Sequence, residues 1–196
     1  KMMQDAKSKS AYPILKIKLG GQDDEKCIKA VREGSPNSRI IVDANEGWNI
    51  ERYNYLVPIF KSIGVELIEQ PFPSNKDHLL KNLDRKIPIC ADESCHDVKS
   101  LEKLMGLYDY INIKLDKTGG LTEAINLLQA AKKSGFKIML GCMVGTSLAM
   151  APALLLSGEC DIVDLDGPLL LKKDRPNPIR YDNFLAFPIS EGLWGV

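Results

Sequence analysis

The feature that most constrains this chain is a regular alternation of short apolar segments with amphipathic ones. Segments rich in apolar and β-branched residues recur roughly every 25 residues, and most stretches between them have helical spacing. Strands separated by helices form parallel sheets, so the fold class is α/β. An open doubly wound sheet and a (β/α) barrel both fit this period. The expected strands are 14–20, 39–43, 65–69, 87–92, 108–114, 136–141 and 161–166.

Ionisable residues at the ends of these strands favour the barrel. In a barrel the C-terminal ends of the strands converge on one mouth, whereas in an open sheet they are spread along an edge. We therefore predict a (β/α)7β-type TIM-like barrel that lacks its first strand. The residues concerned are Lys16, Lys18, Asp43, Glu69, Asp92, Lys114, Asp164 and Asp166.

The segment 49–62 is expected to be an amphipathic helix. Tyr55, Ile59 and Ile63 have helical spacing, and Pro58 predicts a kink or break within the helix.

Residues 1–196 are expected to form a single barrel domain. The tail from about residue 174 has no strong period and is expected to pack back on the barrel or on a missing part. The stretch 1–11 resembles the end of a helix, and a seven-stranded sheet would expose two edges. We therefore expect the native protein to be longer than this chain.

Composition excludes several classes of function. The 26 basic and 26 acidic residues balance and no long basic run occurs, so we expect neither a nucleic-acid nor a membrane partner. No apolar stretch is long enough to span a bilayer, and the five cysteines lack metal-binding spacing, so a cytoplasmic protein with reduced thiols is expected. The chain contains only two histidines, so neither a zinc site nor a Ser-His-Asp catalytic triad is favoured.

Asp43, Glu69 and Asp92 come from the ends of three successive strands. Three carboxylates brought together repel one another unless a cation lies between them. Ligation by oxygen alone, without histidine or cysteine, points to a hard ion, so we expect Mg²⁺ at this place. The alternative is three unrelated solvated acids at the strand ends.

Lys18 and Lys114 are expected on opposite sides of that metal. A lysine that is partly desolvated near other cations has a lowered pKa and can act as a base near neutral pH. Two such lysines facing one carbon can remove a proton from one side and return it on the other, as a racemase or epimerase requires. Lys16 would add positive charge near the enediolate that forms when the proton leaves.

The order of these residues resembles the enolase superfamily, muconate-lactonising subgroup. The matching segments cover nearly the whole chain and are Leu15-Lys16-Ile17-Lys18-Leu19-Gly20, Val42-Asp43-Ala44-Asn45, Ile68-Glu69-Gln70-Pro71, Ala91-Asp92-Glu93-Ser94 and Asn112-Ile113-Lys114-Leu115 followed by Lys117-Thr118-Gly119-Gly120. The resemblance implies that Asp43, Glu69 and Asp92 bind Mg²⁺ and that Lys18 and Lys114 form the acid/base pair. It also implies an N-terminal capping domain, which this chain lacks.

Asp164-Leu165-Asp166 narrows the expected substrate. Two carboxylates on one face of a strand favour a cationic group, and the segment resembles the Asp-x-Asp signature of the dipeptide epimerases. That resemblance implies that Asp164 and Asp166 bind the free ammonium of a small dipeptide, as in the L-Ala-D/L-Glu epimerase type. The alternative is that the pair caps the turn at Gly167-Pro168.

Other functions remain open at this point. A cycloisomerase, an o-succinylbenzoate synthase or an N-acylamino acid racemase of the same superfamily would use the same lysines and metal, although their substrates lack a free ammonium. A non-catalytic barrel fragment is the alternative from another class. A homo-oligomer is compatible with the sequence.

Overall fold

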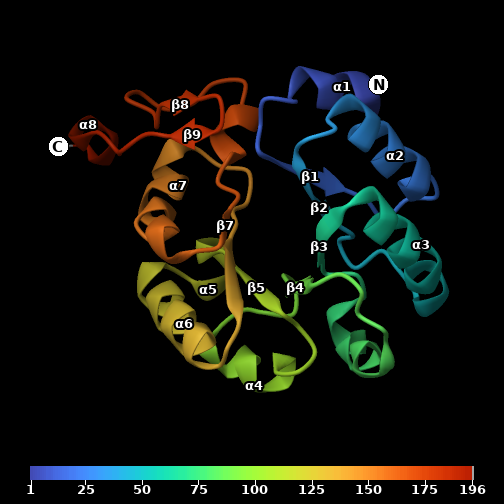
Figure 1. Ribbon diagram of the computed structural model, residues 1–196. Coiled ribbons are helices and arrows are strands. Elements are labelled where there is room, and N and C mark those ends of the chain that lie inside the picture. Colours follow the sequence, from blue (N-terminus) through green and yellow to red (C-terminus); the bar gives the residue numbers. More distant parts are fainter. Residues whose placement is uncertain (196) are drawn as a thin grey trace. The chain divides into compact units, whose positions relative to one another are not determined.

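The computed structural model describes residues 1–195, which divide into two compact units. The first unit contains residues 1–94 and 106–109, and the second contains residues 95–105 and those from 110 onward (Figure 1).

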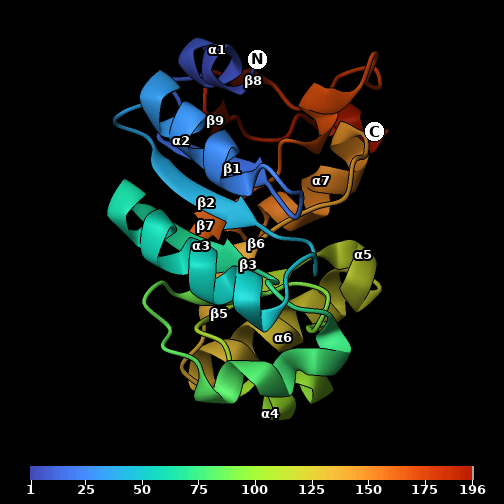
Figure 2. The same cartoon turned by 90° about the vertical axis from the view of Figure 1, so that its right-hand side faces the viewer.

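The first unit is a parallel sheet with helices along one side. Its strands pair in the order β1-β2-β3-β4, all parallel. Figures 1 and 2 show α2 and α3 lying side by side along β1–β3. The elements are α1 (Met2–Ser8), β1 (Ile14–Lys18), α2 (Asp24–Gly34), β2 (Arg39–Asp43), α3 (Ile50–Ile63), β3 (Val65–Glu69), the 3₁₀ segment η1 (Ser74–Asn82) and β4 (Ile89–Ala91).

The strand register sets the level of the charged residues. Lys18 of β1 lies opposite Asp43 of β2, which in turn lies opposite Glu69 of β3. Side chains at paired positions of parallel strands point to the same face of the sheet. The central strand β2 is buried on both faces, because Ile41 and Val42 are both at most 1% exposed. The three ionisable side chains are therefore level with one another at the edge of an apolar core.

Helix α3 differs from its expected form in two ways. It runs without a break from Ile50 to Ile63 through Pro58. Its buried face consists of Tyr53, Leu56, Val57 and Phe60, whereas Tyr55 is 61% exposed. Burial of four large side chains outweighs the one hydrogen bond that proline removes.

Asp24 ties together the loops that follow β1 and β2. It is 2% exposed and accepts hydrogen bonds from the backbone N–H of Gly21 (2.9 Å) and the indole N–H of Trp48 (2.9 Å). It also pairs with Arg52 at 3.0 Å. The loops are in close contact, since a Cβ at Gly20, where φ is +114°, would lie 2.9 Å from the carbonyl oxygen of Ala44.

Replacing Asp24 by Ala should lower the free energy of unfolding by about 3 kcal/mol, because several donors would lose their buried acceptor. Urea denaturation followed by circular dichroism measures this. Asp23→Ala is the matched control: its side chain is 69% exposed, so a change below about 0.5 kcal/mol is expected. Equal stability of the two variants would contradict the assigned role of Asp24.

The second unit also alternates strands and helices. Its strands β5, β6 and β7 are parallel in that order, and α6 packs on β5 and β6. A short antiparallel pair, β8 and β9, follows. The elements are η2 (Val98–Ser100), α4 (Leu101–Leu104), β5 (Tyr110–Ile113), α5 (Leu115–Thr118), α6 (Leu121–Lys133), β6 (Lys137–Leu140), α7 (Ser147–Leu154), η3 (Ser157–Glu159), β7 (Ile162–Val163), η4 (Gly167–Leu170), β8 (Tyr181–Asp182), β9 (Leu185–Ala186) and α8 (Glu191–Trp194).

The last strand is shorter than expected. β7 ends at Val163, so Asp164 follows the strand and Asp166 occupies the N-cap position of η4 without a side-chain cap hydrogen bond. The strand alternation that we used to place both carboxylates on one face therefore does not extend to them. The pairing ends together with β6, because Leu140, the last residue of β6, pairs with Val163. Farther along, a Cβ at Gly167 would lie 2.9 Å from the carbonyl oxygen of Met143, so the chain passes closely at this point.

The tail is hydrogen-bonded to the rest of the second unit. Asp174 accepts a hydrogen bond from the backbone N–H of Ser147 (3.0 Å) at the start of α7, and the Tyr181 hydroxyl donates to the carbonyl oxygen of Leu165 (2.7 Å).

Among the described residues, no helix is both long enough and apolar enough to cross a bilayer.

Candidate active site

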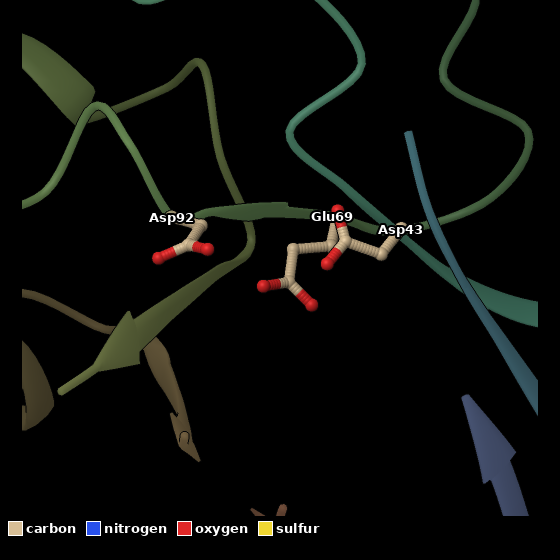
Figure 3. A group of neighbouring side chains, drawn as sticks. All are labelled: Asp43, Glu69 and Asp92. Atoms are coloured by element: carbon tan, nitrogen blue, oxygen red, sulfur yellow. The ribbon is translucent and has the colours of Figure 1, made fainter. Parts of the chain in front are cut away.

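Three buried carboxylates gather at the strand ends of the first unit. Asp43 and Glu69 are the last residues of β2 and β3, and Asp92 directly follows β4. Each is at most 2% exposed, and one oxygen from each lies within 4.8 Å of the others. Figure 3 shows the three side chains in a row, with Glu69 between Asp43 and Asp92. The expected convergence of these residues is therefore present.

Lys16 and Lys18 neutralise part of this negative charge. The Nζ atom of Lys16 lies 2.8 Å from Oε2 of Glu69 and 3.3 Å from Oδ2 of Asp43. Lys18 donates from Nζ to Oδ2 of Asp43 at 2.6 Å. The Lys16 side chain is 15% exposed and that of Lys18 is 61% exposed. Lys16 is therefore fixed among the carboxylates, whereas Lys18 faces an accessible region.

The orientation of Asp43 is fixed from two sides. The backbone N–H of Asn45 donates to Oδ1 at 3.0 Å, while Oδ2 faces the two lysines. Asn45 and Glu46 have φ angles of 44° and 62°, which non-glycine residues adopt rarely. This tight turn after β2 directs the Asp43 carboxylate toward its neighbours.

Burial raises the pKa of Glu69 to about 7. The positive charge of Lys16 opposes this rise, and the negative charges of Asp43 and Asp92 add to it. Glu69 thus binds its proton more tightly than an exposed glutamate, and a cation that displaces this proton would relieve the repulsion.

The remaining candidate residues lie in the second unit, around Cys142. Burial raises the pKa of the Cys142 thiol to about 11; Asp164 and Asp166 add to the rise, while Lys114 opposes it. All three charged groups therefore lie near this thiol. Lys114 is 5% exposed and occupies the N-cap position of α5, directly after β5.

The carboxylate cluster fits a hard divalent cation. It offers only oxygen donors, which are the ligands that Mg²⁺ prefers. Its three carboxylates can carry more negative charge than Lys16 and Lys18 offset, so the cluster attracts a cation. Asp43, Glu69 and Asp92 could hold such an ion.

The family follows from comparison with known proteins. Residues 1–184 match the family model described as enolase C-terminal domain-like, and the chain belongs to this family. The expected α/β fold of the TIM-barrel type is confirmed by a solved enolase family member from Agrobacterium tumefaciens, described as homologous to dipeptide epimerases and containing sodium and L-Ala-L-Glu. That structure matches with a TM-score of 0.96 and 47% identity over 98% of this chain and 59% of its own.

Two curated relatives are named as isomerases of amino-acid derivatives. The chain is 48% identical to N-acetyl-D-glutamate racemase of Pseudoalteromonas sp over all of its length and 62% of the relative's. It is 45% identical to L-Ala-D/L-Glu epimerase of Escherichia coli (strain K12) over 82% of this chain and 50% of that protein. The chain thus spans between half and two-thirds of the length of these relatives.

Sequence reasoning missed one residue at this site. In the sequence Gln70 is noted only as part of the matching segment Ile68-Glu69-Gln70-Pro71, yet its side chain is completely buried and accepts a hydrogen bond from the backbone N–H of Asp92 at 2.9 Å. The available signal was its position: a polar residue directly after the candidate metal ligand Glu69.

Proposed function

We propose that this chain is the barrel domain of a longer Mg²⁺-dependent dipeptide epimerase. The enzyme would invert the α-carbon of the C-terminal residue of L-Ala-L-Glu or a similar dipeptide. The observation that carries this proposal is the cluster of three buried carboxylates flanked by Lys16 and Lys18. The two named relatives and the dipeptide in the Agrobacterium structure support the substrate class.

Each residue has a defined task in this proposal. Asp43, Glu69 and Asp92 would hold Mg²⁺, which supplies positive charge where the substrate carboxylate becomes more negative as the α-proton leaves. Lys18 would exchange a proton with one side of the α-carbon and Lys114 with the other. Lys16, whose Nζ lies 2.8 Å from Oε2 of Glu69, would add positive charge beside the carboxylates.

Asp164 and Asp166 would bind the free ammonium of the dipeptide. Their two negative charges near the half-buried Cys142 thiol suit a cationic group better than a neutral amide. We further propose that a capping domain completes the pocket and that the protein is cytoplasmic, which fits the five free cysteines.

N-acetylglutamate racemisation is the second candidate, because a relative with that activity in its name aligns with the whole of this chain. An N-acetyl group has no ammonium, so Asp164 and Asp166 would then lack a cationic partner. Comparison of kcat/KM for L-Ala-L-Glu and N-acetyl-D-glutamate, with Mg²⁺ and the complete protein, separates the two. We expect the dipeptide to have the higher kcat/KM. A higher kcat/KM for N-acetyl-D-glutamate would contradict the dipeptide assignment and support racemisation of N-acetylglutamate instead.

Metal affinity should depend on pH through Glu69. Because its pKa in the folded protein is about 7 rather than 4.5, Mg²⁺ must displace a proton below pH 7. Affinity measured by isothermal titration calorimetry should therefore be about tenfold weaker at pH 6 than at pH 8. An affinity that is equal at both pH values would contradict this assignment.

The same raised pKa affects stability without metal. Between pH 4.5 and 7 the folded state binds more protons at Glu69 than the unfolded state does. The contribution of Glu69 to the free energy of unfolding should therefore fall as the pH rises through this range. Thermal unfolding in chelator should show this decline for the wild type and a smaller one for Glu69→Gln.

A further inference from the structure

Gln70 has an unusual conformation beside the metal cluster. It follows Glu69 directly, its side chain is completely buried, and its φ angle is 37°, in the left-handed region that favours glycine. A non-glycine residue persists in this region only where its surroundings hold it there, and such residues concentrate at functional sites. The backbone N–H of Gln70 donates to the carbonyl oxygen of Cys90 at 2.9 Å, which continues the pairing of β3 with β4.

The side-chain amide of Gln70 joins the end of β3 to the turn after β4. Its oxygen accepts hydrogen bonds from the backbone N–H groups of Asp92 (2.9 Å) and Ser94 (3.2 Å). Two backbone donors on one atom identify that atom as the oxygen, because an amide nitrogen cannot accept them. Gln70 thus connects the residue next to Glu69 with the backbone of Asp92.

Three polar side chains fix the other end of this amide. The Gln70 nitrogen lies within hydrogen-bond distance of the hydroxyls of Ser94 (2.8 Å) and Tyr108 (3.0 Å) and of the carbonyl oxygen of Phe72 (3.0 Å). Both hydroxyls in turn donate to Oδ1 of Asp77, Ser94 at 2.9 Å and Tyr108 at 2.6 Å. Because the Asp77 carboxylate can only accept, it turns both hydroxyls so that their lone pairs face the amide nitrogen. The amide therefore has a single favourable orientation, with its oxygen toward Asp92.

We propose that Gln70 is a positioning residue of the metal centre, which holds Asp92 at a fixed distance from Glu69 through the Asp92 backbone. The inference rests on the proposed function, because it assumes that Glu69 and Asp92 bind one cation. Asp77, Ser94 and Tyr108 act one step further away by orienting the Gln70 amide. None of these four side chains ligates the metal.

Gln70→Met is the direct test, because methionine keeps the length of the side chain and removes its hydrogen bonds. Mg²⁺ affinity of the complete protein is measured by calorimetry at a temperature where circular dichroism shows the variant folded. We expect the Kd to rise by about 10- to 100-fold, as for other residues that orient metal ligands. Gln129→Met, the same substitution at an exposed glutamine of α6, is the control and should leave the Kd unchanged.

The outcomes separate this inference from the proposed function. If the wild type binds Mg²⁺ and folded Gln70→Met binds it equally well, Gln70 is only structural and the inference is wrong. If the wild type does not bind Mg²⁺, the proposed function and the inference both fail. Should Gln70→Met not fold, Tyr108→Phe replaces it: weaker Mg²⁺ binding supports the inference, and a wild-type Kd overturns it.

Discussion

Replacing Glu69 by Gln should abolish Mg²⁺ binding at millimolar concentrations and reduce epimerisation roughly a thousandfold or more, which corresponds to about 4 kcal/mol. Glu69 lies between Asp43 and Asp92 (Figure 3), so its negative charge attracts a cation to the centre of the cluster. The neutral amide keeps the shape of the side chain but removes that charge. Glu66→Gln is the matched control, because Glu66 lies on the same strand and its side chain is 45% exposed.

Stability distinguishes this effect from simple unfolding. The raised pKa of Glu69 means that its buried charge destabilises the metal-free protein above pH 7. Glu69→Gln should therefore unfold at the same temperature as the wild type or a higher one at pH 8 in chelator. Full activity of Glu69→Gln, or an equal loss in Glu66→Gln, would contradict the role assigned to Glu69.

Replacement of either lysine of the proposed acid/base pair should remove epimerisation. Exchange of the α-proton with solvent should persist for one of the two epimers. A general base contributes about 10²- to 10⁴-fold, so Lys18→Met and Lys114→Met should each lose that much epimerase activity. Each variant should still exchange the α-proton of the one epimer that the remaining lysine faces. The two variants should retain exchange with opposite epimers.

Proton NMR in D₂O, with L-Ala-L-Glu and L-Ala-D-Glu as separate starting compounds, measures both α-proton exchange and epimerisation. Lys26→Met is the control, because the Lys26 side chain is 85% exposed and its ion-pair partner, Asp23, is exposed as well. Retention of exchange with the same epimer in both variants would show that the lysines do not act from opposite sides. Loss of all exchange in one variant alone would point to a single base.

The sequence predicted those parts of the fold that depend on local pattern. β2 and β3 have the expected bounds, Arg39–Asp43 and Val65–Glu69. Their apolar residues must face the core, which also fixes the register in which the two strands pair. Asp43 lies two residues after Ile41, and Glu69 two residues after Leu67, so each carboxylate shares a strand face with an apolar residue. The convergence of Asp43 and Glu69 follows from the register of β2 and β3, in which the two residues pair.

Other features depended on tertiary contacts that the sequence does not display. Helix α3 has apolar residues on two faces, and the face with Tyr53 and Phe60 was buried in place of the one with Tyr55, whose hydroxyl donates to Glu25 at 2.6 Å instead. The early end of β7 coincides with the end of its partner β6, since Val163 pairs with Leu140. The role of Gln70 depends on partners up to 38 residues away. None of these contacts leaves a periodic signal.

The most direct test of the account is exchange of the glutamate α-proton in the complete wild-type protein. Incubation of L-Ala-L-Glu with Mg²⁺ in D₂O should remove the α-proton signal and produce the L-Ala-D-Glu diastereomer, and chelation of the metal should stop both changes. A protein that binds Mg²⁺ but neither exchanges this proton nor forms the diastereomer would contradict the proposed reaction.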